Sequence, residues 1–209
     1  MAHKVFIDGE VGSTGLHGDV TPRNAMSLTM VKELSEVFDA LKADLRIRAI
    51  VLRGEGGHFC AGGDIKDMAG ARAAANSTDS YPFFELNRAF GDLILKMNQI
   101  PQVVIAVLEG AVLGGGFGLA CVSDVAIAKS DANFGMPETT LGIPPAQIAP
   151  FVVKRIGLTQ ARRLALLGTR FDGKEAVKLG IAHHSAEDDE QIDRLVGTTL
   201  DQVKKCAPQ

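Results

Sequence analysis

One arrangement of residue types occurs twice in the chain, and it restricts the fold more than any other feature. The segments "IVLRGEGGHFCAGGDIKDM" (50–68) and "VIAVLEGAVLGGGFGLACVSD" (104–124) each run from an apolar strand through a glycine-rich turn into a helical pattern. A turn of small residues at a helix N-terminus presents unpaired N–H groups, and the helix dipole favours negative charge there. Two such turns side by side would offer two backbone N–H donors to one oxygen, which is an oxyanion hole.

Short apolar strands alternate with helical segments along the rest of the chain. Apolar strands are predicted at 47–54, 102–110 and 124–130. Helical periodicity is found at 27–44, 83–100, 159–168 and 173–180. Strands that are apolar throughout are typical of a sheet covered on both faces, so the sequence predicts an α/β fold. With 209 residues in all, we expect a single domain over 1–209 with its core at about 23–185.

Composition and charge exclude several classes of partner. The net charge is −3 and no basic stripe occurs, which argues against nucleic-acid binding. The apolar runs are too short to span a bilayer, and the N-terminus has no apolar signal region, so we expect a cytoplasmic protein without a membrane partner. The sequence shows no spacing typical of metal ligands, either among the cysteines at 60, 121 and 206 or at the adjacent His183 and His184. No metal site is therefore predicted.

The glycines at 114–116 and 118 match no familiar nucleotide or hydrolase motif. A dinucleotide loop needs G-x-G-x-x-G, a P-loop needs G-x-x-x-x-G-K-[ST], and a hydrolase elbow needs G-x-S-x-G. None of these is present. Two interpretations remain open from the residues themselves: a catalytic turn, or glycines that only permit close packing of a helix on a strand.

The segment 70–82, "GARAAANSTDSYP", is small, polar and without period. It is typical of a lid over a site, and equally of a plain surface linker.

Together, "HFCAGGDIKDM" and "GAVLGGGFGLACVSDVAIAKSDANFGMPETTLGI" resemble the enoyl-CoA hydratase/isomerase family, which has the crotonase fold. The resemblance runs from Arg23, in "RNAMSL", to "GKEAVKLGIAHH", and so covers most of the chain. It implies a ClpP/crotonase-like spiral of ββα repeats that assembles as a homotrimer or a dimer of trimers and binds an acyl-CoA thioester. Coenzyme A would enter only as part of the substrate, and no separate cofactor is implied.

Carried over by position, the resemblance makes the backbone N–H groups of Gly63 and Gly115 the oxyanion donors. The path of the substrate and its coenzyme A would be lined by Arg23, Ala25, Ala61, Gly62, Asp64, Ile65, Lys66 and Gly114. Asp64 can be interpreted as a catalytic acid, but its place after the turn favours an N-cap of the following helix.

The resemblance implies two catalytic glutamates in a hydratase, and this chain retains one. Glu138, in "FGMPETT", matches the first, whereas Gly118 stands at the position of the second. A carboxylate near Phe134 and Met136 would have its pKa raised, which suits it to act as both acid and base.

The run "LGIPPAQIAPFVV", together with Gly118, is similar to hydratases of 3-branched glutaconyl-CoA esters, in leucine or acyclic terpene catabolism. Such substrates carry a distal carboxylate, for which Arg72 and Arg88 are candidate partners. The alternatives are an enoyl-CoA isomerase, an acyl-CoA decarboxylase, or a non-catalytic acyl-CoA-binding paralogue. Family members usually continue beyond "VKKCAPQ", so the C-terminal helical part is expected to be short or missing.

Overall fold

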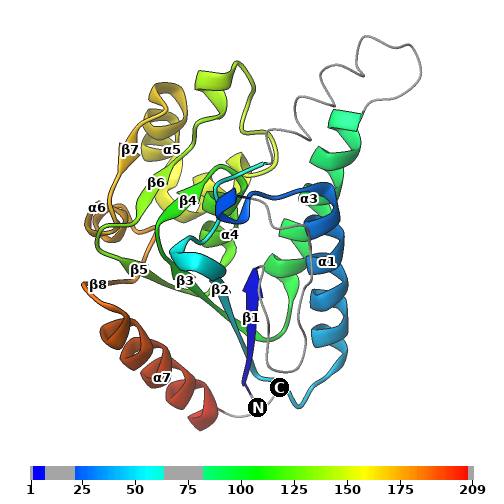
Figure 1. Ribbon diagram of the computed structural model, residues 1–209, viewed down its shortest axis with the longest axis vertical. Coiled ribbons are helices and arrows are strands. Elements are labelled where there is room, and N and C mark those ends of the chain that lie inside the picture. The colour runs from blue at the N-terminus through cyan, green and yellow to red at the C-terminus, as the bar shows by residue number, and fades with distance from the viewer. Residues whose placement is uncertain (1, 8–21, 64–81, 207–209) are drawn as a thin grey trace.

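The computed structural model describes residues 2–7, 22–63 and 82–206. A five-stranded sheet has the order β1-β2-β3-β5-β8, and all its neighbouring strands pair in parallel (Figure 1). Its strands are β1 (Ala2–Ile7), β2 (Ala49–Gly54), β3 (Val103–Leu108), β5 (Val125–Lys129) and β8 (His184–Ala186). The predicted α/β fold with a parallel sheet is therefore confirmed.

A second, three-stranded sheet was not predicted from the sequence. In it β4 (Ala111–Leu113) pairs in parallel with β6 (Asn133–Gly135), which pairs antiparallel with β7 (Arg170–Phe171). These strands have two or three residues each, too few for a period to be visible.

The described helices are α1 (Leu28–Ala43), α3 (Pro82–Gln99), α4 (Gly115–Val122), α5 (Ala149–Leu167), α6 (Gly173–Lys178) and α7 (Asp189–Lys205). Three short 3-10 turns are η1 (Pro22–Asn24), η2 (Glu55–Gly57) and η3 (Glu138–Leu141). Ser27 caps α1 as predicted, because its hydroxyl accepts the Met30 N–H at 3.1 Å.

The helix predicted from Thr159 is the second half of a longer element. α5 begins at Ala149, and Gly157 interrupts it with φ 76° and ψ 160°. The prolines before Thr159 suggest from the sequence that no helix extends there. The helix includes Pro150 because this residue lies in its first turn, where a backbone N–H has no intrahelical partner to lose.

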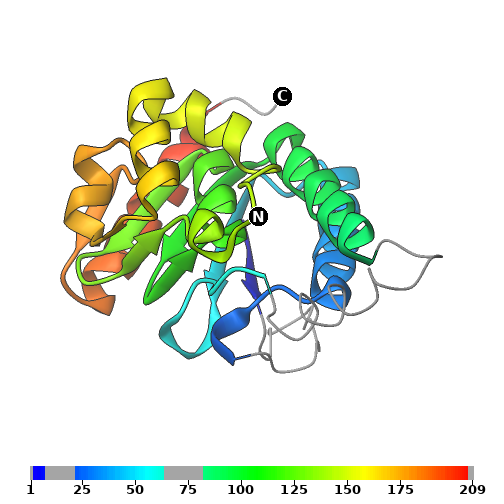
Figure 2. The same ribbon diagram turned by 90° about the horizontal axis from the view of Figure 1, so that it is seen from above.

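Alternate residues along the strands of the large sheet face two separate cores. Ile50, Leu52, Val104 and Ala106 join the larger core with residues of α1, α3, α4 and α5. Their neighbours pack on the opposite face with α7: Val51, Ile105, Val107 and Ile127 against Ile192 and Val196. α1 and α3 lie side by side over the first face in both ribbon views (Figure 2).

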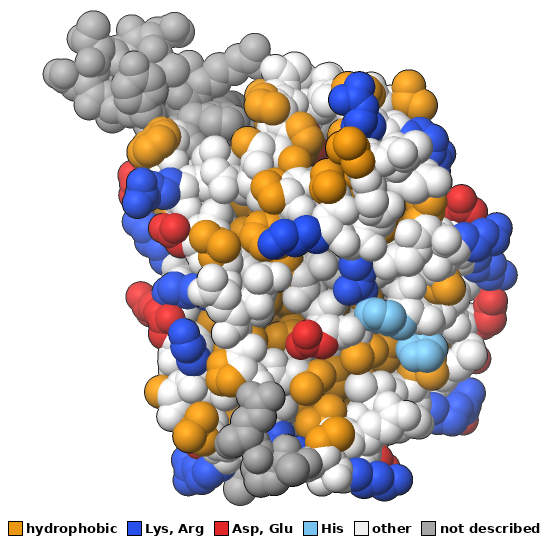
Figure 3. All heavy atoms as spheres, turned by 180° about the vertical axis from the view of Figure 1, so that it is seen from behind, with side chains coloured by type: hydrophobic (Ala, Val, Ile, Leu, Met, Phe, Trp, Pro, Cys, Tyr) orange, Lys and Arg blue, Asp and Glu red, His pale blue; other side chains and the backbone are white. Residues whose placement is uncertain are grey.

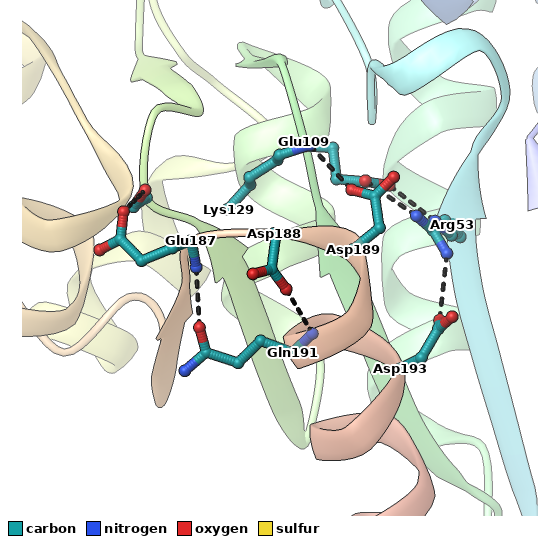
Figure 4. A network of polar contacts seen from close by, with 9 residues as sticks. Arg53, Glu109, Lys129, Glu187, Asp188, Asp189, Gln191 and Asp193 are labelled. Atoms are coloured by element: carbon teal, nitrogen blue, oxygen red, sulfur yellow. Dashed lines mark hydrogen bonds and ion pairs between the residues drawn. The ribbon is translucent and has the colours of Figure 1, made fainter.

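A polar network ties α7 to the ends of β2, β3 and β5 (Figure 4). Glu109, only 4% exposed, receives two hydrogen bonds from Arg53, Nε to Oε2 at 2.7 Å and Nη2 to Oε1 at 2.9 Å. Lys129 pairs with Asp189 of α7 at 2.8 Å. Asp188 caps the helix by accepting the Gln191 N–H at 2.7 Å.

Candidate functional site

The two glycine turns lie against each other because the chain after β2 runs alongside β4. The Cys60 N–H donates to the Ala111 carbonyl at 2.8 Å, and the Leu113 N–H donates to the Cys60 carbonyl at 2.9 Å. Together they form an isolated parallel bridge between Cys60 and Val112. Beyond this bridge, Gly62 lies beside Gly114, and Gly63 forms an isolated bridge with Met26.

The turn residues have backbone conformations that favour glycine. Gly62 has φ 95°, and Gly114, directly before α4, has φ 51° and ψ −116°. A Cβ built on Gly114 would lie 3.6 Å from the Gly62 Cα, so the backbones of the two turns are in contact at these two residues. This is the close approach that the repeated sequence pattern predicts.

Both turns leave an N–H group unpaired within the described part of the chain. The Gly114 N–H donates to the Gly135 carbonyl at 3.0 Å, and the Gly118 N–H to the Gly114 carbonyl at 3.0 Å. Among the residues that the structure describes, no acceptor pairs with the N–H of Gly63 or Gly115. Two N–H donors that have no acceptor, one at each of two adjacent turns, can both donate hydrogen bonds to one oxygen.

A third segment, η1, packs against the first turn. The Ala61 N–H donates to the Arg23 carbonyl at 3.0 Å, and the Met26 N–H to the Gly62 carbonyl at 2.7 Å. The buried Asn24 amide fixes this segment through the carbonyls of Glu55 and His58, at 2.9 and 2.7 Å.

Most of the predicted lining is thus brought together: Arg23, Ala25, Ala61, Gly62 and Gly114. Asp64, Ile65 and Lys66 lie outside the described residues, as do Arg72 and nearly all of the predicted lid.

Glu138, the first residue of η3, directs its carboxylate to the second glycine turn. A Cβ built on Gly114 would lie 3.1 Å from Glu138 Oε1. The other oxygen, Oε2, is buried and has no hydrogen-bond partner among the described residues. Burial raises the pKa of this carboxyl above its ordinary value, and its own backbone N–H and the charge of Arg170 act in the opposite direction. The structure therefore holds a carboxylate with raised pKa against the paired turns.

The space above Gly118 is occupied by Ile148, which directly precedes α5. A Cβ on Gly118 would overlap the Ile148 Cγ2, and would lie 2.9 Å from the Ile148 Cβ and 3.2 Å from the Ile94 Cδ1. Ile148 is 3% exposed. No side chain fits at position 118 as the chain is packed. Sequence reasoning identified Gly118 as unusual but missed Ile148, although the unusual "QIAPF" run contains it.

Apolar side chains also cover Gly115. A Cβ on this residue would lie 2.7 Å from the Met26 Cε and 3.2 Å from the Phe90 Cζ. One residue further along α3, Gly91 leaves room for the side-chain amide of Gln147, whose Cδ would be 2.9 Å from a Cβ there. α3 thus packs against Gly115 through Phe90, and the Gln147 side-chain amide packs against the same helix at Gly91.

Other charged and metal-binding side chains do not gather at this place. Arg88 is exposed on α3. Figure 3 shows Lys and Arg side chains distributed over the face seen from behind, among hydrophobic and acidic ones. Within residues 2–7, 22–63 and 82–206 no cluster of three His, Cys, Asp or Glu could hold a metal ion. No helix in the same ranges has the length and apolar character needed to cross a membrane.

Comparisons with known proteins agree on one family. The family model described as enoyl-CoA hydratase/isomerase matches residues 18–206. The mitochondrial methylglutaconyl-CoA hydratase of Homo sapiens is 35% identical over 189 residues, which are 90% of this chain and 54% of that protein. This chain therefore spans about half the length of that relative.

Two solved structures are more similar in sequence. Pseudomonas aeruginosa AtuE is 61% identical with a TM-score of 0.85, over 89% of this chain and 70% of that one. An enoyl-CoA hydratase/isomerase from Marinobacter aquaeolei is 63% identical with a TM-score of 0.83, over 89% of this chain and 71% of that one.

Proposed function

The chain belongs to the enoyl-CoA hydratase/isomerase family, and from that premise we propose that it adds water across the double bond of an enoyl-CoA thioester. The observation that carries the proposal is the contact between two glycine turns, next to one carboxylate with a raised pKa. Each turn has an N–H group, on Gly63 and on Gly115, without an acceptor among the described residues. Coenzyme A enters as part of the substrate, and the proposed reaction needs no separate cofactor.

The thioester oxygen accepts hydrogen bonds from the N–H groups of Gly63 and Gly115. When water attacks the β-carbon, the electron pair of the double bond moves through the α-carbon onto that oxygen. The negative charge on this oxygen is largest in the enolate, so the two donors bind the transition state that leads to the enolate more strongly than they bind the substrate. This difference in binding lowers the activation barrier. Removal of one such donor typically lowers kcat by about 10²–10³-fold.

Glu138 moves the proton. It takes a proton from the attacking water as the C–O bond forms, and it then gives a proton to the α-carbon, which closes the cycle with the carboxylate unchanged. A raised pKa suits a group that acts as base and then as acid, because its proton affinity lies closer to the working pH. One carboxylate suffices for this sequence of steps.

As substrate we propose a 3-branched glutaconyl-CoA, either the 3-methyl or the isohexenyl compound. Similarity to methylglutaconyl-CoA hydratases supports this choice, and so does the apolar cover formed by Met26, Phe90 and Ile148, which suits a branched chain. For the distal carboxylate we assign Gln147 as donor, since its side-chain amide packs against α3 at Gly91, directly before Ile148, and forms no hydrogen bond among the described residues. A homotrimer or a dimer of trimers is proposed as the assembly.

A second candidate is an enoyl-CoA isomerase. The packing of Ile148 over Gly118 favours it, because moving a proton between two carbons requires one carboxylate and no bound water.

The test follows the loss of enoyl-thioester absorbance with crotonyl-CoA, 3-methylcrotonyl-CoA and the two glutaconyl esters, in isotopically labelled water. We expect turnover of a glutaconyl ester with one solvent oxygen in the product. A product without solvent oxygen would establish the isomerase instead, and binding without turnover would indicate a non-catalytic paralogue.

The Gln147 assignment has its own readout. Gln147→Ala should raise KM for the glutaconyl ester about tenfold and leave KM for 3-methylcrotonyl-CoA unchanged, because a hydrogen bond to a charged group is worth about 1.5–3 kcal/mol. Gln160→Ala, on the surface of α5, is the control. An equal change for both substrates would overturn the assignment.

A further inference from the structure

Cys60 is a fully buried side chain at the junction of the two glycine turns, and the proposed reaction does not use it. Its main chain makes both hydrogen bonds of the bridge to β4, to Ala111 and from Leu113. It is two residues before Gly62 in the first turn. The residue therefore belongs to one turn and is bonded to the strand that leads into the other.

The Cys60 side chain contacts both turns at once. Its sulfur accepts the Gly62 N–H at 3.3 Å. On the other side, a Cβ built on Gly116 would lie 2.7 Å from the Cys60 Cβ and 3.2 Å from its sulfur. The thiol thus fills the space between the first turn and the first residues of α4, and it satisfies a donor in the left-handed turn.

The thiol keeps its proton in this place. Burial raises the pKa of the Cys60 thiol to about 12, although the N–H groups of Gly62, Gly116 and Met26 favour the thiolate. A neutral sulfur is a large, weak hydrogen-bond acceptor, so it holds the turns by size and contact without placing a negative charge beside the oxyanion hole.

We propose that Cys60 is a positioning residue of the oxyanion hole, whose thiol sets the spacing between the N–H groups of Gly63 and Gly115. The inference rests on the proposed function for those two groups. A misplacement of about 1 Å at a reacting centre can lower the rate by 10²-fold, so a side chain that contacts the neighbours of both donors, Gly62 and Gly116, has a measurable effect.

Cys121 provides a matched control in the same protein. It is also buried, on α4, and burial likewise raises its thiol pKa to about 12. Its sulfur has no hydrogen bond to either glycine turn within the described residues. Substitution of Cys121 therefore tests the loss of a buried thiol without a change between the turns.

The experiment compares Cys60→Ala, Cys60→Ser, Cys121→Ala and the wild-type protein. Cinnamoyl-CoA, a conjugated thioester, is the probe, because polarisation of its carbonyl by the two N–H donors shifts its absorbance to longer wavelength. Thermal unfolding, probe affinity, kcat and KM are measured on each protein. Cys60→Ser keeps the shape and an acceptor for the Gly62 N–H, so it remains informative where the alanine variant does not fold.

We expect Cys60→Ala to lose most of the wavelength shift and about 10²-fold in kcat, with KM changed less than threefold. Cys60→Ser should recover part of both, and Cys121→Ala should keep both. If Cys60→Ala and Cys60→Ser keep the wild-type shift and kcat, and lose only stability as Cys121→Ala does, the positioning role is overturned.

Failure of the proposed function has a different signature. A wild-type protein that shifts the probe spectrum but hydrates no enoyl-CoA contradicts the hydratase proposal, and the positioning role is then decided by the wavelength shift alone. A wild-type protein that binds cinnamoyl-CoA without any shift has no oxyanion hole, and both proposals are then wrong.

Discussion

Glu109 is 4% exposed and Glu138 is half-buried with its Oε2 out of contact with water, but the surroundings of the two carboxylates differ. Glu109 lies between the large sheet and α7 and forms two hydrogen bonds with one guanidinium, that of Arg53. Glu138 lies beside the Gly114 turn, its Oε2 has no partner among the described residues, and burial raises its pKa.

The difference separates a structural carboxylate from one available for chemistry. A carboxylate whose two oxygens both accept hydrogen bonds from one guanidinium is committed to that contact, and here the contact serves to hold the structure. An unpaired, partly buried carboxylate makes the fold less stable when ionised, and in return it can take up and release a proton. This difference supports the proposal that Glu138, rather than Glu109, transfers the proton.

The largest expected effect comes from Glu138→Gln. The amide keeps the size of the side chain and removes its proton chemistry, so kcat for an enoyl-CoA should fall by about 10²–10⁴-fold. Steady-state kinetics checks this, with the melting temperature as a control for folding.

Glu109→Gln is the matching change in the other region, and it should affect stability more than kcat per folded molecule. Equal losses of kcat in the two variants would show that the two carboxylates cannot be separated in this way.

Next in size is the loss of stability in Arg53→Met. The variant leaves the Glu109 carboxylate, 5% exposed, without its guanidinium. Removal of one partner of a buried pair costs about 3 kcal/mol here, at the lower end of the usual range because Arg53 is 25% exposed. Urea unfolding measures the loss.

The double variant Arg53→Met/Glu109→Leu should recover much of that stability, because no uncompensated charge remains. A double variant no more stable than Arg53→Met would indicate that packing, not charge, holds α7 there.

Gly118→Ala is expected to cost about 1–3 kcal/mol, the usual penalty for an added methyl group in a filled core. The methyl group would overlap Ile148, and the double variant with Ile148→Ala should remove the overlap and show a favourable coupling energy. Thermal unfolding of the two single variants and the double variant checks this. Additive effects would mean that the two positions do not compete for one space.

The smallest effect is a difference in pH dependence. A carboxyl whose pKa is raised in the folded state binds its proton more tightly there than in the unfolded chain. The free energy of unfolding therefore decreases as the pH rises from 4.5, the ordinary pKa of the Glu138 carboxyl, through its raised pKa in the folded state. Glu138→Gln lacks this decrease, and its melting temperature relative to wild type should rise with pH over that window. The effect is small because the side chain is partly exposed. A constant difference across the window would contradict a raised pKa.

Many of the helices and strands can be predicted from local residue patterns. Contacts between segments that are distant in the sequence cannot be predicted in this way. Ser27 predicts the start of α1. The glycine runs predict turns at 62–63 and 114–116, and the positive φ values of Gly62 and Gly114 are what the structure adds. The strands β4, β6 and β7 are too short to show a period, and tertiary pairing alone defines them.

The site shows the same division. Glu138 and the glycines were predicted from motifs, and the structure brings Glu138 and Gly114 together. The packing of Ile148 over Gly118 joins residues thirty positions apart, and nothing local in either segment predicts it. The role of the two glycine N–H groups stays a prediction until their effect on a bound thioester is measured.

The shared space of Gly118 and Ile148 also affects how this protein can evolve. A larger residue at 118 collides with Ile148, but a smaller residue at 148 only leaves a cavity, which neighbouring side chains can partly fill. Lineages that gain a side chain at position 118 should therefore change position 148 first, whereas lineages that lose one should change position 118 first. The order of the two substitutions is constrained, and either residue is neutral only in the background that the other provides.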